Sequence, residues 1–216
     1  MLAVILSALL AGQPAQAPDP PPLGSRIYRK ARPVEKSEEG GVKVMHLFAA
    51  CVAKTQKTGA KYLLTTEIGS ADQSRAVNRL VGGNSRCLGL YAAKMSLSQT
   101  LFRGAIAEAL YKQQFRQLPI SAPASLVKSV EDVRGEASLV LGAFARCVVS
   151  RKAGGVDALL RTTAASSDEE VAIGALKDIF DPCALERQTI EIDALTLRAA
   201  LAEALYVAVK QAEVRS

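Results

Sequence analysis

The chain has little aromatic character and almost no histidine. Only 5% of its 216 residues are aromatic, none is tryptophan, and His46 is the single histidine. One histidine excludes histidine-rich metal sites, and we expect His46 to be an ordinary, partly exposed helix residue. Few aromatic residues disfavour a β-sandwich, whereas the abundant alanine favours closely packed helices. We therefore predict a mainly α-helical protein.

The motifs that carry common catalytic and cofactor chemistry are also missing. The chain contains no G-x-x-x-x-G-K-[ST], no G-x-G-x-x-G and no H-E-x-x-H sequence. No serine lies in a nucleophile motif that would complete a Ser–His–Asp triad. The four cysteines lack the C-x-x-C spacing of zinc sites. The sequence thus predicts no catalytic residue, no metal and no cofactor.

What the chain does contain is an internal duplication. The segment that begins at Phe48 and Cys51 recurs at Phe144 and Cys147, each residue 96 positions later, without a gap as far as Cys183. One residue is then lost, and the string Ala-Glu-Ala-Leu-Tyr of residues 107–111 recurs at 202–206. Such a long match indicates two copies of one structural unit. Two copies favour a pseudo-symmetric pair, because solenoids usually need three or more repeats.

The duplicated motifs also carry a resemblance. The pattern F-A-x-C-V at residues 48–52 and R-G-A-x-A-E-A-L-Y at 103–111 resembles small exported alphaproteobacterial proteins of unknown function, often built from two copies. The resemblance extends over most of the chain, although Ala199 replaces the glycine in the second copy. It implies export and duplication, and no activity.

Composition divides the chain into five segments. Residues 1–17 combine a short apolar run with Ala15-Gln16-Ala17, the small-x-small pattern of a signal-peptidase site, so we predict a signal peptide. The run is too short to span a bilayer, and we expect no transmembrane segment in the mature chain. Residues 18–41 form a Pro/Gly-rich basic arm, 42–116 form unit 1, 117–134 form a linker and 135–216 form unit 2. We expect a periplasmic or secreted protein.

The four cysteines agree with export. Cysteines at repeat-related positions in an oxidising compartment predict two disulfides. The duplication favours Cys51–Cys87 with Cys147–Cys183, each closing one unit. The pairings 51–147 with 87–183 and 51–183 with 87–147 remain as alternatives that would join the units. A disulfide within one unit would stabilise it by roughly 3–4 kcal/mol in the chain-entropy model.

Helix signals recur in each unit. Apolar residues predict a helix from about residue 42 to 57, ended by Gly59. Ser70 and Ser166 resemble the first residues of capping boxes, and Ser98 and Asp193 are predicted to cap the last helix of each unit. Residues 88–95 and 188–192, after the second cysteine of each unit, alternate enough to permit short strands.

One polar set is retained in both copies on the last predicted helix. The candidates are Arg103, Glu108, Tyr111, Arg198, Glu203 and Tyr206. An arginine and a glutamate five residues apart lie about 140° apart around a helix, so they cannot pair with each other. We expect each glutamate to accept hydrogen bonds from its own unit, as buried carboxylates require. The alternative brings Glu108 and Glu203 together at a pseudo-twofold axis, as an acid/base pair or a cation site.

Charge gives only a broad indication of partners. The net charge is +6, and basic residues crowd the arm, whereas they alternate with acidic residues elsewhere. This distribution predicts no nucleic-acid patch; it is compatible with a solvated basic surface or with loose attraction to anionic lipids or envelope polymers. The leading hypothesis is an exported, non-catalytic interaction or structural protein with an envelope or extracellular partner. The second hypothesis is an enzyme that acts on envelope glycans through Glu108 and Glu203. The third is a membrane-active helical protein of the saposin type, which the low cysteine count of each unit and the lack of a helix that is apolar all round disfavour.

Overall fold

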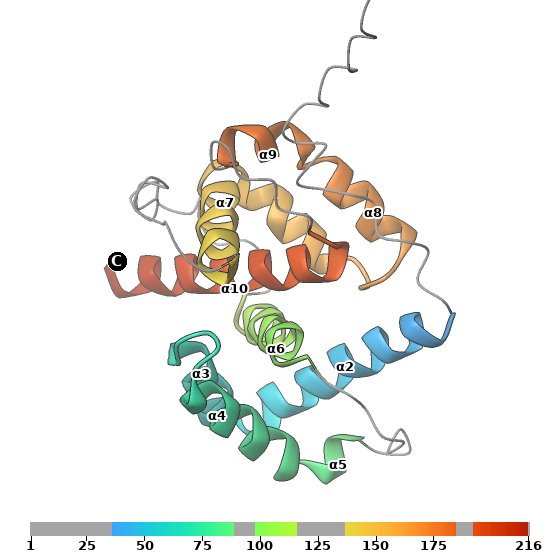
Figure 1. Cartoon of the computed structure of the whole chain (residues 1–216), viewed down its shortest axis with the longest axis vertical. Coiled ribbons are helices and arrows are strands. Elements are labelled where there is room, and N and C mark those ends of the chain that lie inside the picture. The colour runs from blue at the N-terminus through green and yellow to red at the C-terminus, as the bar shows by residue number, and fades with distance from the viewer. Residues whose placement is uncertain (1–35, 89–97, 116–136, 185–191, 216) are drawn as a thin grey trace, which may run out of the picture.

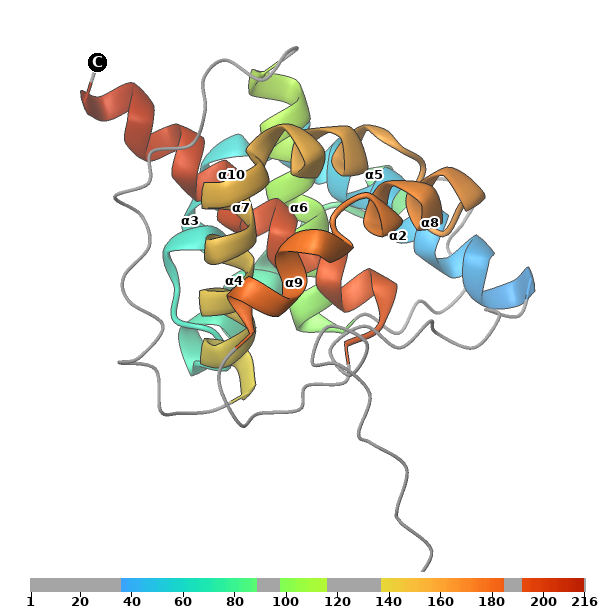
Figure 2. The ribbon, with the colours of Figure 1, turned by 90° about the horizontal axis from the view of Figure 1, so that it is seen from above.

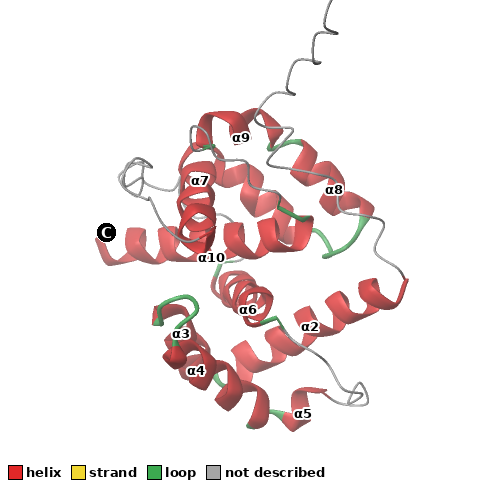
Figure 3. Cartoon of the chain, viewed as in Figure 1, coloured by secondary structure: helices red, strands yellow, loops and turns green. Residues whose placement is uncertain are grey.

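The protein is built from helices arranged in two similar groups. Its computed structural model describes residues 36–88, 98–115, 137–184 and 192–215. Apart from an isolated bridge residue at Ile192, every regular element in these ranges is a helix (Figure 3). The predicted mainly α-helical, disulfide-stapled class is therefore confirmed. The two predicted strand segments fall almost wholly outside the described residues.

The described residues form nine helices. They are α2 (Lys36–Thr55), α3 (Lys57–Thr65), α4 (Ala71–Gly82), α5 (Ser85–Leu88), α6 (Gln99–Gln114), α7 (Ala137–Arg161), α8 (Ser167–Gly174), α9 (Lys177–Cys183) and α10 (Ala194–Arg215). The long helices α6 and α10 cross at the centre of the molecule (Figures 1 and 2). The other helices of unit 1 lie on one side of this crossing, and those of unit 2 lie on the other (Figure 1). None of the described helices is long and apolar enough to cross a membrane.

Each unit begins with a pair of helices separated by a break. In unit 1 the break is Gln56, between α2 and α3, with φ −126° and ψ 51°. In unit 2 it is Lys152, inside α7, with φ −146° and ψ 47°. These residues are equivalent in the duplication, so α7 is the counterpart of α2 and α3 together.

The prediction that Gly59 ends the first helix is wrong. The helix ends at Thr55, and Gly59 lies inside α3. A Cβ atom on Gly59 would lie 3.0 Å from Leu80 Cδ2, and one on the equivalent Gly155 would lie 2.7 Å from Leu176 Cδ2. Gly59 therefore makes room for a leucine inside α4, and Gly155 makes room for the equivalent leucine, which lies in the turn before α9. A packing requirement, and not a helix stop, explains why glycine occurs in both copies.

The predicted boundary of the N-terminal arm is also displaced. Helix α2 begins at Lys36, so the last six residues of the predicted arm, 36–41, are helical. They include Gly40 and Gly41. Glycine costs a helix about 1 kcal/mol relative to alanine, but it keeps the backbone N–H that proline lacks, so a long helix can contain it.

The predicted N-terminal caps are present in both units. Ser70 accepts a hydrogen bond from Gln73 N, and Ser166 accepts one from Glu169 N. The side chains at the third helical position reach back, so Gln73 Oε1 accepts from Gly69 N at 2.9 Å and Glu169 Oε2 accepts from Ala165 N at 2.8 Å. The last helices are capped by Ser98 and Asp193, as predicted.

Ala165 and the equivalent Gly69 share a left-handed backbone conformation that substitutions can test. Ala165 has φ 58°, and Gly69 has φ 80°, a left-handed conformation that costs a residue with a Cβ roughly 1–2 kcal/mol. Because glycine also loses about 0.5–1 kcal/mol of chain entropy, we expect Ala165→Gly to raise the free energy of unfolding by about 0.5–1 kcal/mol. Gly69→Ala is the matched control, and by the same accounting it should lower stability by about 0.5–1 kcal/mol. Urea denaturation measures both, and a destabilised Ala165→Gly variant would contradict the expectation.

Each unit is closed by its own disulfide. Cys51 is bonded to Cys87 and Cys147 to Cys183, with a sequence separation of 36 and 5.6 Å between the Cα atoms in both cases. The pairing favoured by the duplication is therefore confirmed, and the two pairings between units are excluded. Two disulfides are typical of proteins that fold outside the reducing cytosol.

Candidate functional site: a reciprocal arginine–glutamate network

The retained arginines and glutamates meet across the contact between the two units. Arg103 on α6 donates to Glu203 on α10, from Nε to Oε2 at 2.9 Å and from Nη2 to Oε1 at 2.7 Å. Arg198 on α10 donates in the same way to Glu108 on α6, from Nε to Oε2 and from Nη2 to Oε1, both at 2.8 Å. Each pair is bidentate, the strongest geometry for an arginine and a carboxylate. Each bridge thus joins an arginine of one unit to a glutamate of the other.

This arrangement corrects the expectation about the glutamates. We expected their partners within the same unit, but the principal partner of each is the arginine of the other unit. The cause lies at the helix crossing, where a Cβ on Gly104 would lie 2.3 Å from the Cβ of Ala199. These two residues are equivalent in the duplication, so the pseudo-twofold axis passes between them. Any residue near them on one helix consequently faces the reciprocal residue on the other.

The same arginines also complete helix ends in their own units. Arg103 Nη1 donates to Leu63 O at 2.6 Å and Nη2 donates to Leu64 O at 3.0 Å, at the end of α3. Arg198 donates equivalently to Leu159 O at 3.1 Å and Leu160 O at 3.0 Å, at the end of α7. A cation at a helix C-terminus satisfies free carbonyls and is favoured by the helix dipole. Each arginine therefore joins three helices.

Sequence reasoning missed two further members of this network. Thr66 Oγ1 accepts from Arg103 Nη1, and Thr162 Oγ1 accepts from Arg198 Nη1, both at 3.1 Å. Each hydroxyl also donates to a carbonyl three residues earlier, Leu63 O or Leu159 O. The threonines are retained in both copies, and that retention was the available signal.

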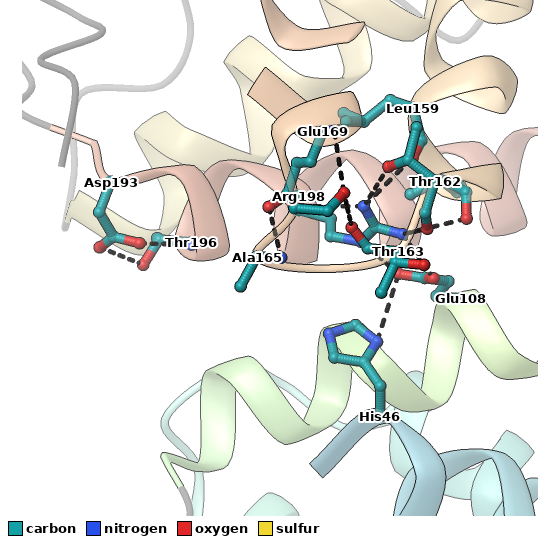
Figure 4. Close-up of polar contacts among 12 residues, drawn as sticks. His46, Glu108, Leu159, Thr162, Thr163, Ala165, Glu169, Asp193, Thr196 and Arg198 are labelled. Atoms are coloured by element: carbon teal, nitrogen blue, oxygen red, sulfur yellow. Dashed lines mark hydrogen bonds and ion pairs between the residues drawn. The ribbon is translucent and has the colours of Figure 1, made fainter. Parts of the chain in front are cut away.

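The two halves of the network differ in charge, and Figure 4 shows the Arg198 half. Arg198 Nη1 also donates to Glu169 Oε1 at 3.0 Å, whereas the equivalent residue in unit 1 is the neutral Gln73. Glu108 also accepts from Lys112 Nζ at 2.6 Å, and His46 Nδ1 lies 3.6 Å from its Oε2. The Arg198 half thus contains two carboxylates and three basic side chains. Its arginine and both carboxylates are 3% exposed or less.

The electrostatics keep Glu108 ionised. Burial raises the pKa of Glu108, but the hydrogen bonds and charge of Arg198, aided by His46 and Lys112, outweigh it and hold the pKa below the ordinary 4.5. Arg198 in turn has a raised pKa, because its two carboxylate partners outweigh its own burial. A carboxylate held in this way accepts hydrogen bonds, but it does not donate a proton near neutral pH.

The retained tyrosines do not join the network. Tyr111 OH donates to Asp157 Oδ1 at 2.7 Å, and Asp157 also accepts from Arg161. Burial and the Asp157 carboxylate raise the pKa of Tyr111. Burial likewise raises the pKa of Tyr206. The equivalent of Asp157 in unit 1 is Lys61, which cannot accept a hydrogen bond, so the two tyrosines have different surroundings.

His46 makes stability depend on pH. Burial lowers the pKa of His46 from 6.5, Arg198 and Lys112 lower it further, and Glu108 partly opposes them. The unfolded chain then binds the proton more readily than the folded protein does. The contribution of His46 to the free energy of unfolding is therefore fully present above about pH 6.5 and is lost on acidification. We expect wild-type protein to lose up to about 1.4 kcal/mol per pH unit below pH 6.5 relative to His46→Gln. Urea denaturation between pH 7 and 5 measures the difference, and parallel curves would contradict it.

The arginines and glutamates therefore form a structural network in which each buried carboxylate is paired with a basic side chain. Within the described residues, no group of three or more His, Cys, Asp or Glu side chains could hold a metal ion. Comparisons with protein-family models, with curated proteins and with solved structures gave no match.

Proposed function

We propose that this chain is an exported protein, periplasmic or secreted, that acts by binding and not by catalysis. Its partner is a component of the envelope or the extracellular space. The observation that carries the proposal is that both oxygens of Glu108 and of Glu203 accept hydrogen bonds from an arginine of the other unit. The retained arginine and glutamate side chains are thus used to hold the two units together. The two disulfides support export.

The alternative of a glycan-cleaving enzyme receives less support. Glycoside hydrolysis with two carboxyl groups needs one of them protonated, as the general acid. Glu108 has a lowered pKa and is 3% exposed, so it suits neither the acid role nor contact with a glycan. Glu203 is 23% exposed, but it is already paired with Arg103.

An assay on envelope glycan separates the two functions. Purified protein, Glu108→Gln and Glu203→Gln would be incubated with isolated peptidoglycan, and released soluble fragments would be quantified against heat-denatured protein. We expect no release above this control from any of the three. Release by the wild type that Glu203→Gln abolishes, with the variant still folded by circular dichroism, would establish an enzyme instead.

Export has its own test. We expect the exported protein to begin at Pro18 by intact mass, and none of its thiols to react with an alkylating reagent before unfolding. A cytosolic protein with four reactive thiols would refute export.

A further inference from the structure

The two units differ sharply in the charge of equivalent segments. Residues 50–88 of unit 1 contain two acidic residues, Glu67 and Asp72, against six basic residues. The basic residues are Lys54, Lys57, Lys61, Arg75, Arg79 and Arg86. The equivalent residues 146–184 of unit 2 contain five basic and six acidic residues. The formal net charge of these segments is thus +4 in unit 1 and −1 in unit 2.

Tertiary contacts bring four of the basic residues to one corner of unit 1. A Cβ on Gly83, after α4, would lie 3.0 Å from Gln56 Nε2, between α2 and α3. Thr55 Oγ1 donates to Asn84 Oδ1 at 3.2 Å, and Cys51 is bonded to Cys87 in α5. The C-terminal ends of α2 and α4 therefore lie close to the start of α3 and to α5. We call the exposed side chains at this convergence the basic corner; its members are Lys54, Lys57, Arg79 and Arg86.

The fold itself does not require these cations. At the equivalent positions unit 2 has Ser150, Ala153, Ala175 and Pro182, and it forms the same helices and disulfide. None of the four basic side chains forms an ion pair with a residue that the structure describes. Lys54 and Arg79 lie in the last turns of α2 and α4, where the helix dipole favours a cation. The four cations nevertheless have no ion-pair partner among the described residues, which favours a function at the surface.

One exposed aromatic residue lies on α3, the helix that begins at this corner. Tyr62 on α3 is 49% exposed and follows Lys61, whereas unit 2 has Ala158 at this position. The other described tyrosine and phenylalanine side chains are buried. Tyrosine among lysines suits the headgroup level of a bilayer, where the ring lies in the interface and the cations meet phosphates.

We propose that the basic corner and Tyr62 form a docking surface for an anionic lipid bilayer. The protein then lies peripherally on the membrane through α3, α4 and α5, with α8 and α9 on the far side of the central crossing (Figure 1). This inference names the partner class within the proposed binding function and rests on it. Its failure is distinguishable, because absence of lipid binding leaves the peptidoglycan assay unchanged.

Co-sedimentation with lipid vesicles tests whether the basic corner binds the membrane, and a double variant in unit 2 serves as the control. The test variant, Lys54→Ser with Arg79→Ala, installs the residues of unit 2. The control, Arg146→Ala with Arg151→Thr, removes the same charge by installing Ala50 and Thr55 of unit 1. Each cation near an anionic surface contributes about fivefold in affinity. We expect the test variant to bind vesicles with about one third phosphatidylglycerol roughly 25-fold more weakly than wild type, and the control to lose much less.

Further sedimentation experiments test whether the negative charge of the lipid is required for binding. Wild-type protein should not bind vesicles of phosphatidylcholine alone, and added salt should release it from anionic vesicles. Binding to a soluble anionic polysaccharide but not to vesicles, or equal losses by both variants, would overturn the proposal.

A tryptophan reporter places the contact. Because the chain contains no tryptophan, Tyr62→Trp gives a single fluorescent site, and Ala158→Trp is its equivalent in unit 2. We expect anionic vesicles to shift the emission of Tyr62→Trp to shorter wavelength and to leave Ala158→Trp unchanged. A shift of the reporter at 158 alone would place the contact on the wrong unit and refute the proposal.

Discussion

Replacing Arg198 by methionine is expected to lower the free energy of unfolding by about 3–5 kcal/mol, because it leaves two buried carboxylates without their main partner. Glu108 and Glu169 are both only 3% exposed, and each accepts a hydrogen bond from Arg198. Methionine fills a similar volume, so the loss reflects charge and hydrogen bonds more than packing. The backbone carbonyls at the end of α7 also lose their donor. Urea denaturation at pH 7 measures the change.

The equivalent variant in unit 1 is the matched control. Arg103→Met removes the same kind of bidentate pair, but Glu203 is 23% exposed and can be hydrated, and the neighbouring Gln73 carries no charge. We expect it to cost about half as much. Adding Glu108→Leu to Arg198→Met should recover part of the loss, because one unpaired carboxylate is then removed. Equal losses for the two arginine variants would show that burial of the carboxylates is not the cause.

The duplication made much of this structure predictable. It identified the disulfide pairing, because only Cys51–Cys87 and Cys147–Cys183 keep each repeat closed. It also identified the arginines and glutamates, because polar residues retained on an apolar helix need buried partners. Helical geometry then excluded pairing within the helix. What remained open was whether the partner belonged to the same unit, and that depends on how the last helices cross.

Other features depend on contacts that a single sequence does not reveal. The breaks at Gln56 and Lys152 contain neither glycine nor proline, so no local signal precedes them. They arise where tertiary packing overrides helix propensity. His46 was expected to be an ordinary helix residue, and its sequence neighbours indicate nothing more. It lies beside Glu108 only because α2 packs along α6.

Replacing Gly104 by alanine should separate α6 from α10, with a loss of about 3 kcal/mol, the upper part of the range for overpacking. The new methyl group would lie 2.3 Å from the Cβ of Ala199, a distance that only movement of the helices can relieve. That movement would also stretch the Arg103–Glu203 bridge, whose arginine is the preceding residue. Gly154→Ala is the control, because nothing lies within 4 Å of its Cβ position. It should be neutral or stabilise α7 by up to about 1 kcal/mol.

The exchange variant Gly104→Ala with Ala199→Gly tests the pseudo-twofold axis directly. If equivalent residues meet at the crossing, exchanging them restores the same pair of one methyl group and one hydrogen, with the units interchanged. We therefore expect the double variant to recover most of the stability that Gly104→Ala loses, giving a large coupling energy in a double-mutant cycle. Additive losses would show that residues 104 and 199 are not in contact. In that case the crossing, and with it the reason for the reciprocal bridges, would have to be placed elsewhere on the two helices.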